Sequence, residues 1–187
     1  PMKVLSLNAA GYKPFPVKLK NTGHSVQVNA PAGQIMKNGA SEYSLLQVHF
    51  HTPSEHTVKG KPFPMEAHFV HKHKSGKLLV IGVLFTEGKA NAELAKFWAK
   101  LPAKSGAEIT LPKVNVNLKA LFPKKVDTYR YSGSLTTPPC SEIVSWVVYT
   151  TPQTASKEQI KRFEALYKGN ARPTLPLHGR KISLGNR

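Results

Sequence analysis

Histidines that could bind a metal are concentrated in one short part of this chain. Six of its eight histidines fall between positions 49 and 73, where His49 and His51 form a His-x-His pair and His68 lies in a Glu-x-His segment. Three neutral imidazoles that leave one coordination position open are typical of catalytic zinc, whereas structural zinc is usually closed by a fourth protein ligand. These three residues therefore predict a catalytic Zn²⁺ site.

Two polar residues are placed to orient these ligands. Gln47 and Glu66 each precede a predicted ligand by two residues, and side chains two apart on a strand point to the same face. Metal-bound histidines usually donate their other ring proton to a carbonyl or a carboxylate. The remaining histidines of interest, His56, His71, His73 and His178, are interpreted as hydrogen-bonded or exposed residues without a metal.

The elements that must position these residues are mostly strands. Gly and Pro clusters separate short segments rich in β-branched and aromatic residues, a pattern that favours β structure. The predicted strands are 25–29, 43–51, 65–72, 78–86, 127–132 and 143–150.

Two helices are predicted beside these strands. One begins at an Asn91 cap and places Leu94, Phe97, Trp98 and Leu101 at helical spacing. The other begins at a Ser156 capping box and carries Ile160, Phe163 and Leu166. We expect a mainly β (α+β) fold, with a central twisted and largely antiparallel sheet and peripheral helices.

Length and composition restrict the class of protein. The 187 residues suit a single domain over 1–187, and 40% hydrophobic residues are ordinary for a globular chain. No run approaches the roughly 18 apolar residues of a membrane-spanning helix. The formal charge of +17 comes from scattered Lys and Arg. This pattern favours a solvated basic surface over a nucleic-acid site.

Four motifs in this order resemble those of the α-class carbonic anhydrases, and of their bacterial branch in particular: QVHFH at 47–51, SEHTV at 54–58, EAHFVH at 66–71 and SGSLTTPPCSE at 132–142. The resemblance extends from about Asn21 to Lys181. It implies the α-carbonic anhydrase fold and zinc-dependent reversible hydration of CO2 to bicarbonate and a proton, through zinc-bound hydroxide. It also implies a periplasmic or secreted location and inhibition by sulfonamides and anions at the zinc.

The resemblance assigns further residues to the reaction. Thr136 would accept a hydrogen bond from the hydroxide and donate one to Glu55, and Thr137 would lie near bicarbonate. His24, in the segment Asn21 to Ser25, would shuttle protons, a task that suits its ordinary pKa of about 6.5. The wall where CO2 waits would consist of Val70, Val80, Leu135, Val144 and Trp146.

The chain also departs from the family pattern. The upstream segment usual in the family, with its partner for Cys140, does not appear in this sequence. We therefore expect an N-terminally shortened chain in which Cys140 is free, joined to a second chain or paired with an upstream cysteine. The sequence is also compatible with a homodimer.

Three other functions remain as alternatives. A zinc hydrolase would use the same ligands on an ester or peptide, although the chain has no His-Glu-x-x-His helix. A binding module derived from the family would have lost zinc ligands, yet all three are present. A polyanion-binding protein is suggested by charge alone.

Overall fold

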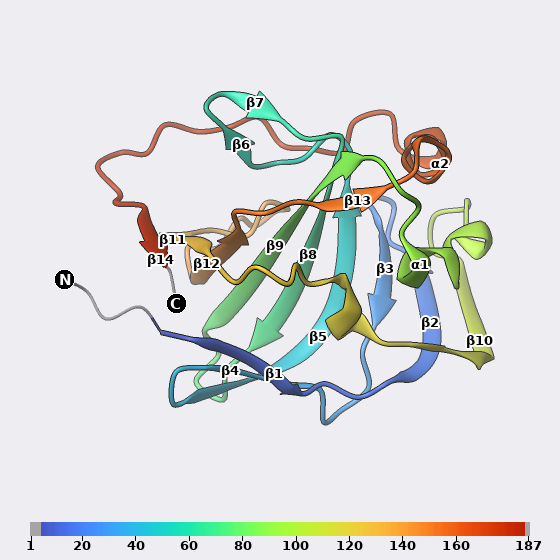
Figure 1. The fold of residues 1–187 in the computed structure, drawn as a ribbon, viewed down its shortest axis with the longest axis horizontal. Helices are drawn as coiled ribbons and strands as arrows, with labels where there is room; N and C mark the ends of the chain where they lie inside the picture. The colour runs from blue at the N-terminus through green and yellow to red at the C-terminus, as the bar shows by residue number, and fades with distance from the viewer. Residues whose placement is uncertain (1–4, 186–187) are drawn as a thin grey trace.

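The computed structural model describes residues 5–185, which form one large twisted sheet with few helices (Figure 1). The main path through the sheet runs in the order β10 (Glu108–Val116), β2 (Phe15–Asn21), β3 (Val26–Asn29), β5 (Ser41–His51), β8 (Met65–Lys72), β9 (Leu78–Glu87), β12 (Val144–Tyr149), β11 (Thr128–Gly133) and β14 (Ser183–Gly185). The elements beside this path are β1 (Leu7–Gly11), β4 (Ile35–Asn38) and β13 (Gln153–Ala155).

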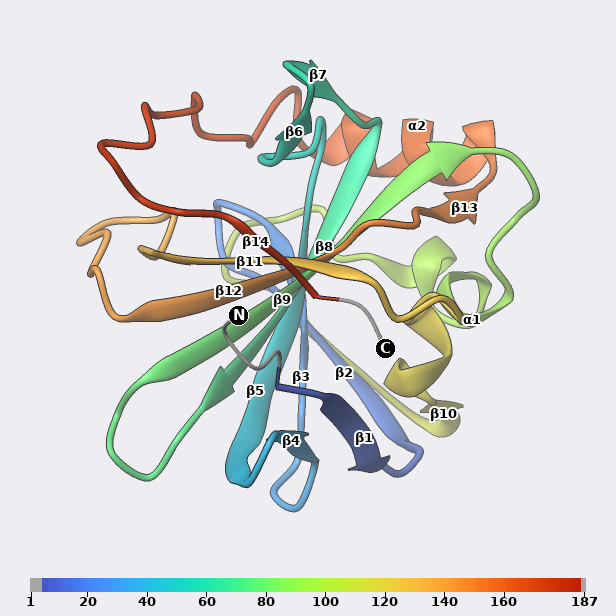
Figure 2. The same cartoon turned by 60° about the vertical axis from the view of Figure 1, so that its left-hand side comes forward.

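The sheet is antiparallel at most of its strand pairs. Only β12 and β13, among the described strands, run parallel to their neighbour β9. β1 pairs with β4, and β4 with β5. A separate two-stranded ribbon is formed by β6 (Thr57–Val58) and β7 (Lys61–Pro62). Figure 2 shows the strand direction turning steadily across the sheet, which agrees with the predicted twisted, largely antiparallel architecture.

All six predicted strands are present, with ends shifted by at most two residues. Several further strands were not predicted. β2 alternates buried and exposed residues, as expected of a strand with one face in the core. Its sequence pattern could therefore have predicted a strand. β10 contains Pro112, which is tolerated because β10 lies at an edge of the sheet.

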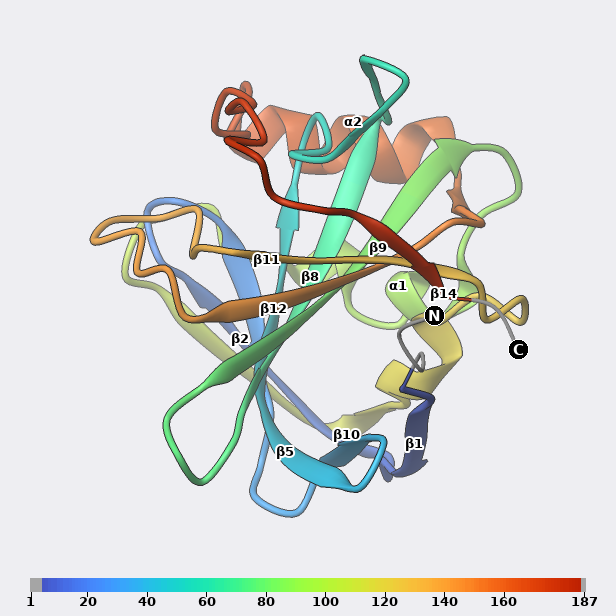
Figure 3. The ribbon, with the colours of Figure 1, turned by 90° about the vertical axis from the view of Figure 1, so that its left-hand side faces the viewer.

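The helices lie to one side of the sheet, where α2 (Lys157–Leu166) is the longest (Figures 1 and 3). Its predicted capping box is present, because Ser156 and Gln159 each bond the other's backbone. The first predicted helix is shorter than expected. Asn91 caps α1 (Ala92–Ala95), which gives way to the 3₁₀ turn η1 (Trp98–Lys100). Leu101 precedes Pro102, a position that disfavours helical backbone. A second 3₁₀ turn is η2 (Leu118–Leu121).

The central strands separate two hydrophobic clusters. Along β8, Ala67 and Phe69 belong to the larger cluster, whereas Val70 belongs to a smaller one on the opposite face. β9 alternates in the same way, with Ile81 on the larger side and Val80 on the smaller. Since all of β8 except Lys72 is buried, the polar residues on its second face lie inside the protein.

A bulge in β5 sets which face each of its residues occupies. Leu45 pairs with His71 and Gln47 with Val70, so Leu46 is an additional residue with no partner in this ladder. Leu46 is exposed, while Leu45 and Val48 are both buried in the larger cluster. A bulge restores the phase of a strand in this way.

Candidate metal centre

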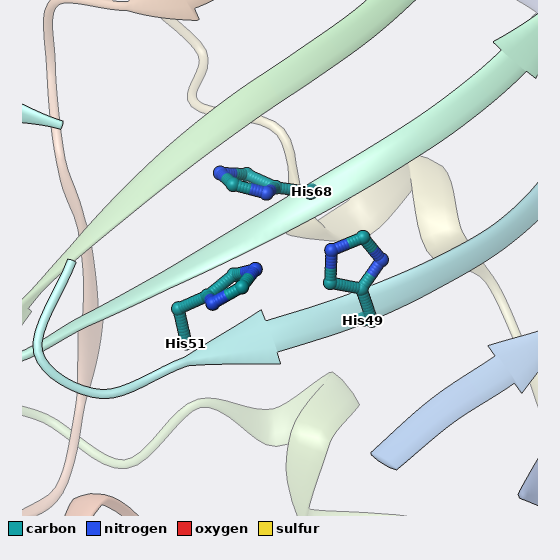
Figure 4. A group of neighbouring side chains, drawn as sticks. All are labelled: His49, His51 and His68. Carbon is teal, nitrogen blue, oxygen red and sulfur yellow. The ribbon is translucent and has the colours of Figure 1, made fainter. Parts of the chain in front are cut away.

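Strand register brings the three predicted ligands together. His49 of β5 pairs with His68 of β8, and His51 lies two residues along β5 on the same face. Figure 4 shows their imidazoles turned toward one another. The ring centroids are 4.6 to 5.2 Å apart, and one nitrogen from each ring lies within 4.8 Å of the others.

Hydrogen bonds fix which nitrogen of each β5 histidine is available. His49 Nδ1 lies 2.8 Å from Gln47 Oε1, and His51 Nδ1 lies 3.0 Å from the carbonyl oxygen of Asn170. Both partners are acceptors, so each Nδ1 carries the proton and each Nε2 keeps its lone pair. The predicted role of Gln47 is thus matched by geometry, and Asn170 is an additional support that the sequence did not reveal.

His68 faces two carboxylates with its two nitrogens. Its Nε2 lies 3.1 Å from Glu66 Oε1, an approach not aligned as a hydrogen bond, and its Nδ1 lies 3.8 Å from Glu55 Oε2. Glu66 Oε2 also accepts hydrogen bonds from the backbone N–H groups of Glu55 and His56, at 2.9 and 3.0 Å. These bonds hold the Glu66 carboxylate next to the His68 ring, which is the position expected of a residue that orients His68.

The donor set fits a metal cation. Burial lowers the pKa of His49 well below its usual range, and the nearby His68 and His51 lower it further. Burial is also the main cause that lowers the pKa of His51 to about 4, with His68 as the second cause. These imidazoles are neutral near pH 7 and can act as ligands. His51 Nε2 and Glu55 Oε2 are buried without a hydrogen-bond partner, a costly arrangement that a bound cation would relieve.

His56 supports this centre more directly than expected. Its Nδ1 lies 2.6 Å from Glu66 Oε1, and its Nε2 lies 2.5 Å from the hydroxyl of Tyr131. Burial alone would lower the pKa of His56, but the Glu66 carboxylate outweighs it and raises this pKa. Burial alone would raise the pKa of Glu66, yet His56 and His68 hold it well below its usual range.

His56, Glu66 and His68 form a second group that could hold a metal within the described residues. The short contact between His56 and Glu66 instead marks this group as a hydrogen-bonded support for His68. His56 was interpreted as a hydrogen-bonded or exposed residue without a metal, and its hydrogen bonds to Glu66 and Tyr131 were not predicted. Its position next to Glu55 in the SEHTV motif was the available clue.

Besides His56, the three other histidines interpreted as hydrogen-bonded or exposed lie away from the metal centre. His71 is buried, where Tyr12 OH donates to its Nε2 and its Nδ1 donates to the carbonyl oxygen of Leu79, 3.1 Å away. Burial lowers its pKa to about 4. His73 bonds Ser75 Oγ at 2.8 Å, and His178 is exposed. Each matches the prediction of a satisfied or exposed residue.

Glu55 lies between the candidate ligands and the segment that follows α2. Its side chain is 6% exposed, its Oε2 lies 3.5 Å from His51 Nε2, and its Oε1 accepts a hydrogen bond of 2.8 Å from the backbone N–H of Arg172. Thr136 is half-buried and lines the cavity over the histidines. Glu55 Oε2 has no hydrogen-bond partner, so the expected bond from Thr136 to this oxygen is not formed.

A cavity of about 680 Å³ opens over two residues of the triad. His49, His51, His24, Thr136 and Thr137 all contribute to its lining. A neighbouring cleft of about 760 Å³ shares Thr136 with this cavity. The structure thus brings the predicted shuttle and both predicted threonines to the same cavity as two of the ligands.

The five residues predicted to form an apolar wall lie together. Val70, Val80, Val144 and Trp146 belong to the smaller hydrophobic cluster, and Leu135 packs against it. Val70, Val80 and Trp146 are direct neighbours across β8, β9 and β12. The Trp146 ring centroid is 4.8 Å from that of His68. The wall therefore adjoins the metal centre.

Cys140 follows this site in the loop between β11 and β12. It is half-buried and forms no disulfide among residues 5–185. Its positive φ of 55° places it in the left-handed region.

The twisted sheet and its three-histidine centre define the α-carbonic anhydrase class of proteins. A family model described as eukaryotic-type carbonic anhydrase matches residues 2–185, and the chain belongs to this family. Carbonic anhydrase from Pectobacterium carotovorum is 45% identical over 165 residues, which are 87% of this chain and 66% of that protein. The chain spans about two thirds of the length of such curated relatives.

Solved structures agree with this assignment. The α-carbonic anhydrase from Thermovibrio ammonificans, in complex with the inhibitor sulfanilamide, has a TM-score of 0.89 and 39% identity, over 97% of this chain and 79% of that one. The α-carbonic anhydrase from Photobacterium profundum has a TM-score of 0.88 and 41% identity, over 97% and 82%. None of the helices within residues 5–185 has the length and apolar character needed to cross a membrane.

Proposed function

We propose that this chain catalyses the reversible hydration of CO2 to bicarbonate and a proton with Zn²⁺ held by His49, His51 and His68. The observation that carries this proposal is the convergence of three imidazoles beside an apolar wall. Zinc held there would lower the pKa of its water to about 7, the value for which carbonic anhydrase is itself the reference case, and so supply hydroxide near neutral pH.

The residues around the triad divide the remaining tasks. Val70, Leu135 and Trp146 offer an uncharged surface on which CO2 can rest without losing hydrogen bonds to water. Thr136 and Glu55 would orient the nucleophile, which requires the Thr136 hydroxyl to turn toward Glu55 when the site is occupied. Apo hydrogen bonds are often loose and tighten in the reacting complex. Thr137 would contact bicarbonate from the cavity side.

His24 would take the proton to solvent. It is exposed at the rim of the cavity that His49 and His51 line, so water can connect it to the reacting centre. Histidine is the side chain best suited to this task, because imidazole can both accept and release protons near neutral pH.

A known inhibitor complex of a relative supports a proposal about inhibition of this chain. A relative with 39% identity is known in complex with sulfanilamide, and we propose that sulfonamides and small anions bind this chain at the zinc. We also propose, from the family resemblance, that the single domain works in the periplasm or outside the cell.

The decisive experiment is stopped-flow CO2 hydration on zinc-loaded and zinc-stripped protein. We expect activity with zinc only, abolished by sulfanilamide. His49→Ala, which removes a ligand, should lose both zinc and activity, whereas His73→Ala should keep both. No hydration by a sample shown to hold one zinc per chain would reject the proposed activity and favour a binding module.

A further inference from the structure

The turn that carries His24 is rigidly built although His24 itself is exposed. Its flanking residues Asn21 and Ser25 are 2% and 5% exposed. Asn21 Oδ1 accepts the Gly23 N–H at 2.9 Å, and Thr22 Oγ1 accepts the His24 N–H at 3.3 Å. Gly23 has a φ of 84°, a left-handed conformation that glycine adopts without strain. The backbone beneath His24 therefore has a defined position.

One residue from a distant part of the chain connects this turn to the metal centre. Asn170 Nδ2 donates to the carbonyl oxygens of His24 and Phe50, both at 3.0 Å, while its Oδ1 accepts the Thr52 N–H at 2.8 Å. Its own backbone carbonyl accepts the ring N–H of His51. Asn170 thus contacts the shuttle turn and a metal ligand at the same time.

A second residue secures the same turn from the same side. The hydroxyl of Tyr167 lies 2.5 Å from Asn21 Oδ1 and 3.2 Å from the carbonyl oxygen of Ser25. Its ring packs on Phe163 of α2 at 5.7 Å between centroids. The segment after α2 therefore fixes the turn at both ends, through Tyr167 at Asn21 and Ser25 and through Asn170 at His24.

We infer that Asn170 is a positioning residue for proton transfer, because its side chain holds the His24 turn at a fixed place relative to His51. This inference rests on the proposed function and adds a specific residue to it. Proton transfer is sensitive to geometry, and a displacement of about 1 Å can lower a rate on the order of a hundredfold. The bond to His51 uses the backbone carbonyl, so a side-chain substitution separates the two contacts.

The first test is a double-mutant cycle with zinc-loaded His24→Ala, Asn170→Ala and the double variant. We expect Asn170→Ala to lower kcat about tenfold in dilute buffer and to change kcat/KM for CO2 about twofold or less, with kcat restored by imidazole. The double variant should match His24→Ala, since a residue acting through His24 has no effect once His24 is gone. Independent, multiplying effects would overturn the inference.

A second variant guards against simple misfolding. Tyr167→Phe keeps the ring on Phe163 and removes only the hydroxyl, so it should lower kcat in the same direction by a smaller factor. Tyr43→Phe, which lies at the other end of β5, is the matched control and should leave kcat unchanged. Loss of zinc affinity in Asn170→Ala as large as its loss of kcat would also overturn the inference, because the side chain would then act through His51.

The positioning itself can be measured without activity. Amide hydrogen exchange of the zinc-free chain should be about tenfold faster over residues 21–25 in Asn170→Ala than in the wild type, with β8 unchanged. Equal exchange in the two proteins would show that Asn170 does not hold the turn. Absence of hydration by the zinc-loaded wild type would reject the proposed function separately, and the exchange result would still decide this point.

Discussion

Gly82 of β9 lies directly against the carboxylate of Glu66. A methyl group at position 82 would lie 2.8 Å from Glu66 Oε1 and 3.3 Å from a methyl carbon of Val148. Gly82 is also the register partner of His68. The absence of a side chain on β9 therefore creates the space in which Glu66 supports His68.

Gly82→Ala is expected to weaken zinc binding. The added methyl must displace Glu66 or Val148, which we expect to destabilise the fold by about 1 to 3 kcal/mol and to lower zinc affinity about 10- to 100-fold. Competition with a chromophoric chelator measures the affinity. Gly88→Ala, whose methyl would meet only the Thr154 side chain at 3.1 Å, is the control; equal affinities in the two variants would contradict this account.

Glu66→Gln tests the carboxylate at constant size. Glu66 uses one oxygen for His56 and the other for two backbone N–H groups, and an amide can replace only one of these acceptors. We expect the free energy of unfolding to fall by about 1 to 3 kcal/mol and the zinc affinity to weaken. Urea unfolding measures the first change, and competition with a chelator measures the second. Glu108→Gln, at an exposed pair with Lys20, should change stability by about 0.5 kcal/mol or less.

Thr136→Ala should slow hydration and leave zinc content intact. If the hydroxyl orients the nucleophile, its loss should lower kcat/KM on the order of a hundredfold, measured by stopped flow with metal analysis of the same sample. Thr136→Ser keeps the hydroxyl and should retain most of the activity. Full activity of Thr136→Ala would mean that the orienting role is misassigned.

His71 should make stability depend on pH. Its pKa is about 4 in the folded protein and near 6.5 when unfolded, so the unfolded chain binds a proton first as pH falls. This contribution is fully present above pH 6.5 and is lost as pH falls toward 4, by about 3 kcal/mol in total. Urea unfolding gives the stability of each protein at pH 7 and at pH 4.5. Between these two pH values, His71→Gln should lose less stability than the wild type. Equal losses would refute the lowered pKa of His71 as the cause.

The convergence of His49, His51 and His68 could be predicted from the sequence because it depends on local geometry. Alternation along β5 places His49 and His51 on one face, and the motif in β8 adds His68. The two paired strands are separated in the chain by residues 52–64, which contain only the small β6–β7 ribbon, so their register depends on few elements. The central strands and α2 were predictable for the same reason, since each carries its own periodicity or cap.

The supporting residues could not be predicted in this way. Asn170 accepts from His51 across 119 positions, and Tyr131 meets His56 across 75. Such contacts depend on where two distant parts of the chain, strand β11 and the segment after α2, pack against the site. No local sequence pattern specifies this. The helical spacing of Leu94, Phe97, Trp98 and Leu101 likewise did not indicate that α1 ends at Ala95 and that a 3₁₀ turn follows it.

The bulge in β5 also determines which changes of chain length the metal centre can survive. Leu46 is the one residue of this ladder that has no partner, so its deletion would leave Leu45 opposite His71 and Gln47 opposite Val70, as they are now. Deletion of Val48 would instead invert the alternation between Gln47 and the histidines, turning one set away from the cavity. Within a single strand, therefore, one position can be removed while the three histidines stay on one face, whereas a position two residues further on cannot.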